Sequence, residues 1–333
     1  MPIEIINDAA AMESLAEEWG ELWRRAPGAS PFQSPHWLLP WWKRFGSDTP
    51  FVVVDRNARL DALAPLYILR DDDSGESLGM LLGTGVTDYL DILVANPESL
   101  PPLHQAIAAA DCQLWDFQQL RPTSPLLEAI LPDGWTCSVE EQDPCPVLSL
   151  AGAGTELEGL LSTHARKKLR YSRRCAEREG AVRYESATAE SLPSLLDSLF
   201  ELHEARWRRR GLPGVLADDV IQEFHRDVTS RMLAAGALRL HAMHIGGRPA
   251  AVFYGFAHQG TVYYYLSGYD PRYEKLGIGN LIVAHAIDEA IREGATTFDF
   301  LRGAEEYKYA WGATDRMNRH AVWMRGGEQV RDS

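Results

Sequence analysis

The sequence is poor in cysteine. It has four in 333 residues, with no C-x-x-C pair and no histidine at ligand spacing: Cys112, Cys137, Cys145 and Cys175. This scarcity argues against a disulfide framework and against a zinc site, and it fits a reducing compartment. No metal is therefore expected.

Long apolar runs and excess positive charge are also missing. No stretch approaches the roughly 20 apolar residues of a membrane-spanning helix, and residues 1–8 alternate like a strand, unlike a signal peptide. Asp and Glu number 47 against 33 Lys and Arg, which gives a net charge of −14. This charge argues against DNA as a partner. The sequence predicts a soluble, cytoplasmic protein.

What is present is a pattern that occurs twice. Residues 51–69 and 238–257 both predict a hairpin, and LWDF at 114–117 matches TFDF at 297–300. Repeats of about 150 residues indicate a duplicated domain rather than a solenoid. A Pro- and Gly-containing stretch at 132–154 is the predicted seam, with units over 1–145 and 146–333.

Each half mixes strands and helices without strict alternation. Hairpin strands followed by one helical crossover predict an α/β fold whose mixed, largely antiparallel sheet has one parallel join. The predicted strands lie near residues 3–7, 51–55, 60–68, 113–118, 181–186, 238–245, 249–257, 261–268 and 296–301.

A glycine-containing turn in the second half stands between a predicted strand and a predicted helix. Gly277 and Gly279, in YEKLGIGN at 273–280, follow the strand at 261–268 and precede the helix at 281–292. Glycines allow close backbone approach, and a helix start offers free N–H groups to an anion such as pyrophosphate. In the first half a G-x-G at 83–85 has no predicted helix after it. We therefore expect the first half to be catalytically silent.

These segments resemble a known family. EKLGIGN resembles the acyl-CoA pyrophosphate loop, Q/R-x-x-G-x-G/A, of the GNAT (GCN5-related) N-acetyltransferase superfamily, with Glu274 where that family prefers Gln or Arg. FDFLRGAEEYK at 298–308 looks like a segment of the BioF2-like acetyltransferases, a group that includes CelD-like proteins of cellulose biosynthesis. Segments 18–19, 31–34 and 37–42 resemble that family's opening.

The resemblance implies two GNAT-like units, with acetyl-CoA or another acyl-CoA bound by the second. The pantetheine arm would pair like an added strand with the main chain exposed where the sheet splays. A backbone N–H of the strand at 263–268 would polarise the thioester carbonyl. The residues expected to bind acyl-CoA are Lys275, Leu276, Gly277, Ile278, Gly279, Asn280 and Leu266.

Transfer to an acceptor needs a base and an acid. Asp299 and Glu306 are the candidate bases; Asp299 lies between two phenylalanines, where a carboxyl pKa would rise. Alternatively, Asp299 is a structural partner of Arg302 or Lys308. The resemblance implies that Tyr307 protonates the leaving thiolate. Lys308 could instead pair with a carboxylate or with an acidic substrate group, and the alternative for residues 305–309 is a surface helix start whose acidic residues complement the helix dipole.

Acceptor contacts are expected from basic residues. His203 and Arg206 share a face of a predicted helix, although a lone histidine in such a helix is more often a packing or surface residue, and Arg302 is a further candidate. The basic run at 164–174 has six Lys and Arg within the nine residues 166–174. Its Arg166 and Arg170 could bind CoA phosphates, an anionic glycan, a lipid head group or RNA, or could pair with the acidic surface.

The predicted function is N- or O-acyl transfer, directly from acyl-CoA to an amine or hydroxyl. The acceptor, a small molecule or a glycan or lipid precursor, would enter from a cleft toward the first half. A similar basic helix in the Fem-type peptidyltransferases makes aminoacyl-tRNA-dependent transfer an alternative, with tRNA as the partner. The second alternative is a non-catalytic scaffold in polysaccharide or lipid assembly.

Overall fold

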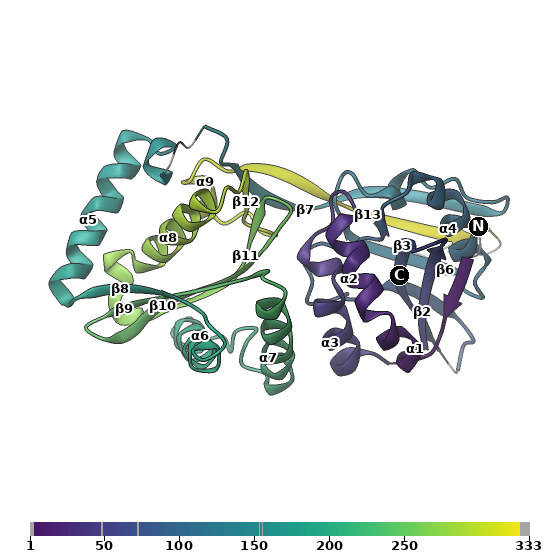
Figure 1. The fold of residues 1–333 in the computed structure, drawn as a ribbon, viewed down its shortest axis with the longest axis horizontal. Coiled ribbons are helices and arrows are strands. Elements are labelled where there is room, and N and C mark those ends of the chain that lie inside the picture. The colour runs from purple at the N-terminus through teal and green to yellow at the C-terminus, as the bar shows by residue number, and fades with distance from the viewer. Residues whose placement is uncertain (1–2, 48, 72, 153, 155, 327–333) are drawn as a thin grey trace. The chain divides into compact units, whose positions relative to one another are not determined.

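The computed structural model describes residues 3–47, 49–71, 73–152, 154 and 156–326 (Figure 1). The chain forms two compact units. The first comprises Met1–Pro144 and Arg316–Ser333, and the second comprises Cys145–Asp315. The predicted units at 1–145 and 146–333 placed the whole C-terminal segment in the second unit. Here the segment that starts at Arg316 belongs to the first unit.

The first unit contains a mixed sheet in the order β1-β2-β3-β4-β6-β13. Only the β4/β6 pair is parallel. The strands are β1 (Ile3–Ile6), β2 (Thr49–Arg56), β3 (Leu60–Arg70), β4 (Ser77–Leu81), β6 (Leu114–Leu120) and β13 (Thr314–Arg325), and the two-residue β5 (Leu93–Val94) pairs with β3. The helices are α1 (Ala9–Ser14), α2 (Ala16–Arg25), α3 (Pro35–Phe45) and α4 (Leu100–Ala109).

Aromatic residues fill the core of the first unit. Trp115, Phe117 and Trp323 are fully buried between β6, β13 and α4. In α3, Trp37 and Trp41 are buried as well. These two tryptophans therefore pack the interior and offer no surface to a partner.

The second unit has the strand order β7-β12-β11-β10-β9-β8, and here only β11 and β12 are parallel. Strand β7 (Trp135–Ser149) belongs to this unit from Cys145 onward. The other strands are β8 (Val182–Ser186), β9 (Leu238–Ile245), β10 (Arg248–His258), β11 (Thr261–Tyr269) and β12 (Thr297–Asp299). The helices are α5 (Thr163–Glu179), α6 (Leu192–Arg208), α7 (Asp219–Ala234), α8 (Ile278–Arg292) and α9 (Glu306–Tyr309).

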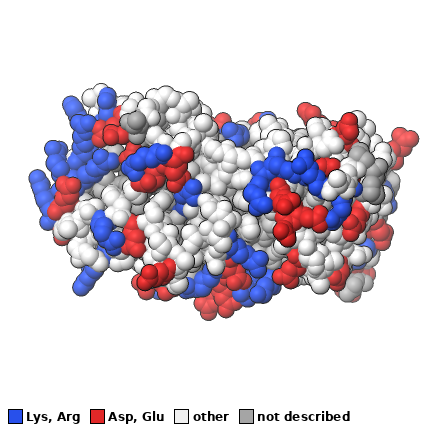
Figure 2. All heavy atoms as spheres, viewed as in Figure 1, with Lys and Arg blue, Asp and Glu red and all other residues white. Residues whose placement is uncertain are grey.

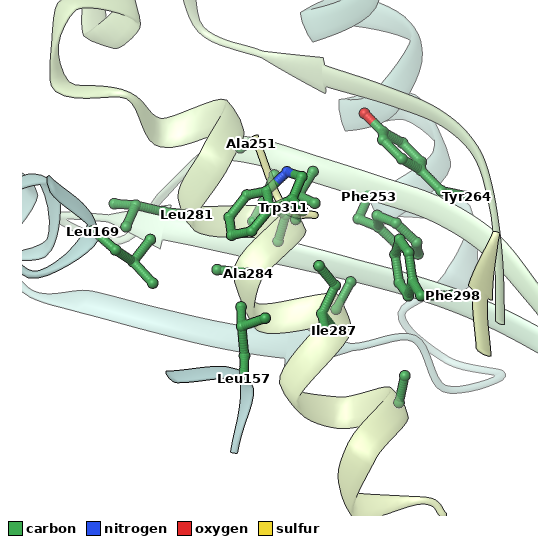
Figure 3. Close-up of a cluster of buried hydrophobic side chains, with 14 of the residues drawn as sticks. Leu157, Leu169, Ala251, Phe253, Tyr264, Leu281, Ala284, Ile287, Phe298 and Trp311 are labelled. Atoms are coloured by element: carbon green, nitrogen blue, oxygen red, sulfur yellow. The ribbon is translucent and has the colours of Figure 1, made fainter. Parts of the chain in front are cut away.

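Helices cover both faces of the second unit's sheet, with α5 and α8 on one and α6 and α7 on the other (Figure 1). Leu281 and Ile287 of α8, at helical spacing, pack against Phe253, Phe298 and Trp311 (Figure 3). This burial fixes α8, and hence the loop before it, against β10, β11 and β12.

The mixed α/β fold and every predicted strand are confirmed. The boundary between Pro144 and Cys145 lies within the predicted seam at 132–154, and most of that stretch is the strand β7, whose backbone pairs with β12. Its sequence is rich in acidic residues and proline, so it lacks the alternation that marks a half-buried strand. Strands β4 and β13 were also not predicted.

Candidate acyl-donor site

The site begins where two parallel strands part. Strand β11 pairs with β12 only through residues 261–263 and 297–299, and then continues to Tyr269 with β10 alone. Opposite Tyr254 and Gly255, the β11 partners are Leu266 and Tyr264, so Tyr265 is an extra residue in a β-bulge. Beyond the splay, β11 therefore has one edge free of strand pairing, and a bulge disturbs its ladder at the same place.

The loop after β11 ends in a helix start with free amides. Asp270 caps the short η5 helix (Pro271–Leu276), and Gly277 adopts a left-handed conformation with φ 72°. Asn280 N and Leu281 N donate to the Gly277 carbonyl, but the amides of Ile278 and Gly279 have no acceptor among the described residues. Two N–H groups at the positive end of a 15-residue helix form an anion-binding position.

A pocket of about 260 Å³ joins this loop to the splay. Its walls come from the loop, from β11, from the end of α6 and from α9. The lining residues are Gly277, Gly279, Asn280, Val283, Glu274, Tyr264, Ser267, Tyr269, Arg206, Arg210 and Tyr307.

Two tyrosines and a serine form one wall. The rings of Tyr264 and Tyr307 meet edge to face with centroids 6.5 Å apart, and the Tyr264 hydroxyl lies 2.5 Å from Ser267 Oγ. Burial, and secondly Tyr264, raises the pKa of Tyr307 above its ordinary value, and burial likewise raises the pKa of Tyr264. Both phenols therefore keep their protons at neutral pH, and Tyr307 can act as a proton donor.

Arg206 carries an uncompensated positive charge into the pocket. Its guanidinium lies over the ring of Tyr269, 4.8 Å from the centroid, and its buried Nε has no hydrogen-bond partner among the described residues. Nearby Arg208 and Arg209, in contrast, pair with Glu204 and Glu274. A half-buried cation without an acceptor favours an anionic ligand.

Glu274 is the departure from the GNAT loop pattern, and its charge is compensated. Glu274 Oε2 lies 3.4 Å from Arg209 Nη1, and Glu274 Oε1 accepts a hydrogen bond from the Tyr269 hydroxyl at 3.3 Å. The Arg209 side chain also donates to the Pro271 carbonyl. An arginine from α6's end thus offsets the carboxylate beside the candidate anion position.

Two of the predicted catalytic residues instead hold the loop after β12. Asp299, 1% exposed, accepts a hydrogen bond from the amide of Leu301, whose φ is 57°. Lys308, 3% exposed, donates to the carbonyls of Leu301, Arg302 and Gly303 and pairs with Glu305. The Lys308 ammonium is thus committed to carbonyls and a carboxylate of the chain, and neither residue lines the pocket.

His203 and Glu306 also lie outside the pocket lining. His203 is buried and accepts a hydrogen bond from Trp207 Nε1 at 2.9 Å, and burial, then Arg206, lowers its pKa to about 4. These contacts agree with the alternative that His203 is a packing residue. Glu306, exposed, is the first residue of α9, directly before Tyr307.

The predicted basic helix is α5, and part of its charge is neutralised. Arg170 and Arg173 both pair with Glu158, and Arg173 also approaches Asp288. Arg166 donates to the Thr163 hydroxyl on its own helix. Figure 2 shows many Lys and Arg side chains where α5 lies, at the left of the view. The exposed cations include Lys167, Lys168 and Arg174.

The first unit has no equivalent helix start. Its G-x-G lies at Gly83 and Gly85, with φ of 99° and 101°, and residues 86–92 after it contain no helix. Without oriented amides, that turn lacks the feature that makes the second unit's loop an anion position.

Comparison with known proteins agrees with this assignment of the second unit. Residues 163–309 match the family model described as an acetyltransferase (GNAT) domain. No curated protein matches the sequence. Among solved structures, FemX is 12% identical with a TM-score of 0.67, over 96% of this chain and 97% of that one.

Two further structures are similar. The C-terminal domain of a putative lysylphosphatidylglycerol synthetase from Agrobacterium fabrum is 13% identical (TM-score 0.59), over 95% of this chain and 92% of that one. A tandem GNAT protein from the clavulanic acid biosynthesis pathway is 14% identical (TM-score 0.50), over 98% and 100%. The predicted tandem GNAT-like fold is confirmed, and the family match is to a class of acyltransferases. The narrower BioF2-like, CelD-like resemblance stays a prediction.

The loop at 275–280 was predicted from the sequence, whereas several residues of the pocket wall were not. Gly277, Gly279, Asn280, Tyr307 and Arg206 come together as pocket residues. The missed lining residues are Tyr264, Ser267, Tyr269, Arg210 and Val283. Tyrosines of β11 were visible in the sequence, but the bulge that decides which of them face the pocket was not. Among the described residues, no helix is long and apolar enough to cross a membrane, and no group of acidic, His or Cys side chains is placed to hold a metal.

Proposed function

We propose that the second unit is an acyl-CoA-dependent N- or O-acyltransferase, with acetyl-CoA as the donor. The observation that carries this proposal is the pair of amides at Ile278 and Gly279 without an acceptor among the described residues, in a loop whose Gly277 and Gly279 line the same pocket as Tyr307. Those amides would bind the donor pyrophosphate, with Lys275, Leu276 and Asn280 in the same loop. The pantetheine arm would run along the free edge of β11 past Leu266.

The chemistry would be direct transfer at the splay. The acceptor nitrogen or oxygen attacks the thioester carbonyl, whose developing negative charge a backbone N–H at the β11 bulge would stabilise. The C–S bond then breaks, and Tyr307 gives its proton to the departing thiolate. Of the two candidate bases, Glu306 is favoured because it is exposed beside Tyr307, whereas Asp299 is occupied with Leu301.

Arg206 supports an anionic ligand in this pocket. Its position over Tyr269, with no carboxylate partner in the described part of the chain, suits an acidic group on the acceptor or on the donor. Arg302, whose carbonyl accepts a hydrogen bond from Lys308, stays a candidate acceptor contact.

The test is a thermal-shift titration with acetyl-CoA and CoA, using ATP as the control. A ligand that binds only the folded state at 100 times its Kd stabilises by about 2.7 kcal/mol. We expect both CoA species to raise Tm and ATP to leave it unchanged. Gly277→Trp should abolish the shift, and Arg206→Gln should reduce it without lowering the Tm of the free protein. No shift at millimolar acetyl-CoA would refute the proposal.

Aminoacyl-tRNA-dependent transfer is the second candidate, favoured by the structural similarity to FemX and by the exposed cations of α5. It predicts that replacing Arg166, Lys167 and Arg170 by neutral residues abolishes transfer and that CoA has no effect. Transfer from charged tRNA in the absence of CoA is the measurement that would establish it. A non-catalytic scaffold predicts turnover of neither donor.

A further inference from the structure

The basic helix α5 lies directly against the loop that ends at Gly277, just before the two amides at the start of α8. A Cβ built on Gly277 would fall 3.1 Å from Ser172 Oγ, so the Ser172 side chain covers the left-handed residue that precedes the free amides. Helix α5 contacts both η5 and α8. Anything bound at those amides therefore lies close to the stripe of α5 that contains Ser172.

This helix is a local exception to the charge of the chain. Residues 163–179 contain seven Lys and Arg and two Glu, so their net charge is 7 − 2 = +5, within a chain of −14. Arg170 and Arg173 are neutralised by Glu158 and Asp288 on one side of the helix. The positive charge of α5 that is available to a ligand comes from its remaining Lys and Arg residues.

Two cations are placed beside this loop, one on α5 and one in the loop itself. Lys168 precedes Ser172 by four residues and so lies one turn away on the same stripe. Lys275 belongs to the loop itself, two residues before Gly277. Both side chains are exposed, and neither has an ion pair among the described residues. Lys167 and Arg174, in contrast, point about 140° and 160° away from Ser172 around the helix.

Resting on the proposed acyl-CoA function, we propose that Lys168, Ser172 and Lys275 bind the 3′-phosphate of the donor's adenosine. A phosphate monoester carries a charge of about −2 at neutral pH, and the amides of α8 offer no full charge to balance it. Two ammonium groups and a hydroxyl donor supply charge-assisted hydrogen bonds of the kind that select such a group. The protein would then discriminate between CoA and 3′-dephospho-CoA.

The experiment is calorimetric titration of the full chain with CoA and with 3′-dephospho-CoA. In the wild type we expect CoA to bind about 10- to 100-fold more tightly, as for one or two charged hydrogen bonds. The variant Lys168→Ala/Lys275→Ala should bind the two ligands equally. The control Arg174→Ala, an exposed cation of the same helix facing away from the loop, should keep the wild-type preference.

The outcomes separate this inference from the proposed function. Equal binding of both ligands by the wild type, or a preference that survives in the double variant, overturns the 3′-phosphate site and leaves an acyl-CoA enzyme standing. Binding of neither ligand refutes the acyl-CoA function and the inference with it. An oligoribonucleotide that displaces CoA, and whose binding Arg174→Ala weakens, would assign the helix to RNA and also overturn the inference.

Discussion

Replacing Gly277 and Gly279 separately by alanine distinguishes loop conformation from ligand approach. Gly277 has φ 72° and ψ 31°, a left-handed conformation that costs a non-glycine residue about 1–2 kcal/mol. The new methyl would also lie 3.1 Å from Ser172 Oγ, so Ser172 must move. For a unit of this size, each kcal/mol lowers Tm by about 2–4 °C. We therefore expect Gly277→Ala to lower the Tm of the free protein by about 2–8 °C.

Gly279→Ala should behave in the opposite way. Gly279 lies in the first turn of α8 with ordinary helical geometry, where alanine is favoured over glycine by up to about 1 kcal/mol. Its added methyl would lie 3.3 Å from Tyr269 Cδ1, on the pocket side of the amide proposed to hold phosphate. The free protein should keep its Tm, while the shift produced by acetyl-CoA should shrink.

Scanning calorimetry with and without saturating acetyl-CoA measures both effects. Gly294→Ala is the matched control, because Gly294 has φ 81° but a methyl there would meet nothing within 4 Å. It should show the conformational cost without the Ser172 contact. Comparing Ser172→Ala alone with Ser172→Ala/Gly277→Ala isolates the part due to the Ser172 Oγ contact. A full acetyl-CoA shift in Gly279→Ala would refute the placement of the pyrophosphate.

Three further outcomes follow from the contacts. Tyr307→Phe should lower kcat about 10²- to 10⁴-fold with unchanged acetyl-CoA affinity; a normal kcat would exclude Tyr307 as the acid. Lys308→Met should destabilise the protein by about 2–4 kcal/mol in denaturant unfolding, because three carbonyls lose a charged donor; a change below 0.5 kcal/mol, roughly that of a surface residue, would contradict this. Burial, then His203, lowers the pKa of His225 to about 3. Between about pH 6.5 and 3 the unfolded chain therefore binds a proton at His225 that the folded chain does not. The free energy of unfolding should then fall as pH drops through this range. The slope should flatten in His225→Asn.

The elements that could be predicted from the sequence are those whose signals are local. The hairpin of β9 and β10 has a Gly246-Gly247 turn between its strands, and α8 has regular apolar spacing after a glycine turn. Strand β7 depends on partners far away in the sequence, and three of its residues are acidic and only three are buried. Nothing within its 15 residues distinguishes it from a linker.

The same distinction applies to the site. The chemical type of Asp299 and Lys308 indicated catalysis, but burial and backbone contacts decide their role, and these depend on where the loop at 301–303 folds back. Tyr307 was identified through the family resemblance. Its partner Tyr264 depends on the bulge at Tyr265, which shifts the side-chain alternation of β11 and lies opposite Tyr254 and Gly255 of β10, a strand that is distant from Tyr307 in the sequence.

The pairing of Glu274 with Arg209 could not be read from the sequence because the two residues are 65 positions apart. Since both side chains are about half exposed, the charge compensation is modest, and Arg209→Ala should weaken acetyl-CoA binding about 2- to 10-fold. Arg209 also donates to the Pro271 carbonyl, so a weaker loop could produce the same loss. Glu274→Gln separates the two causes, because it removes the charge and restores a residue that the GNAT loop prefers. If charge is the cause, Arg209→Ala/Glu274→Gln binds acetyl-CoA as the wild type does, and the affinity lost in Arg209→Ala declines as ionic strength rises. If the double variant stays weak at every salt concentration, Arg209 acts by holding the loop, and Glu274 needs no compensation.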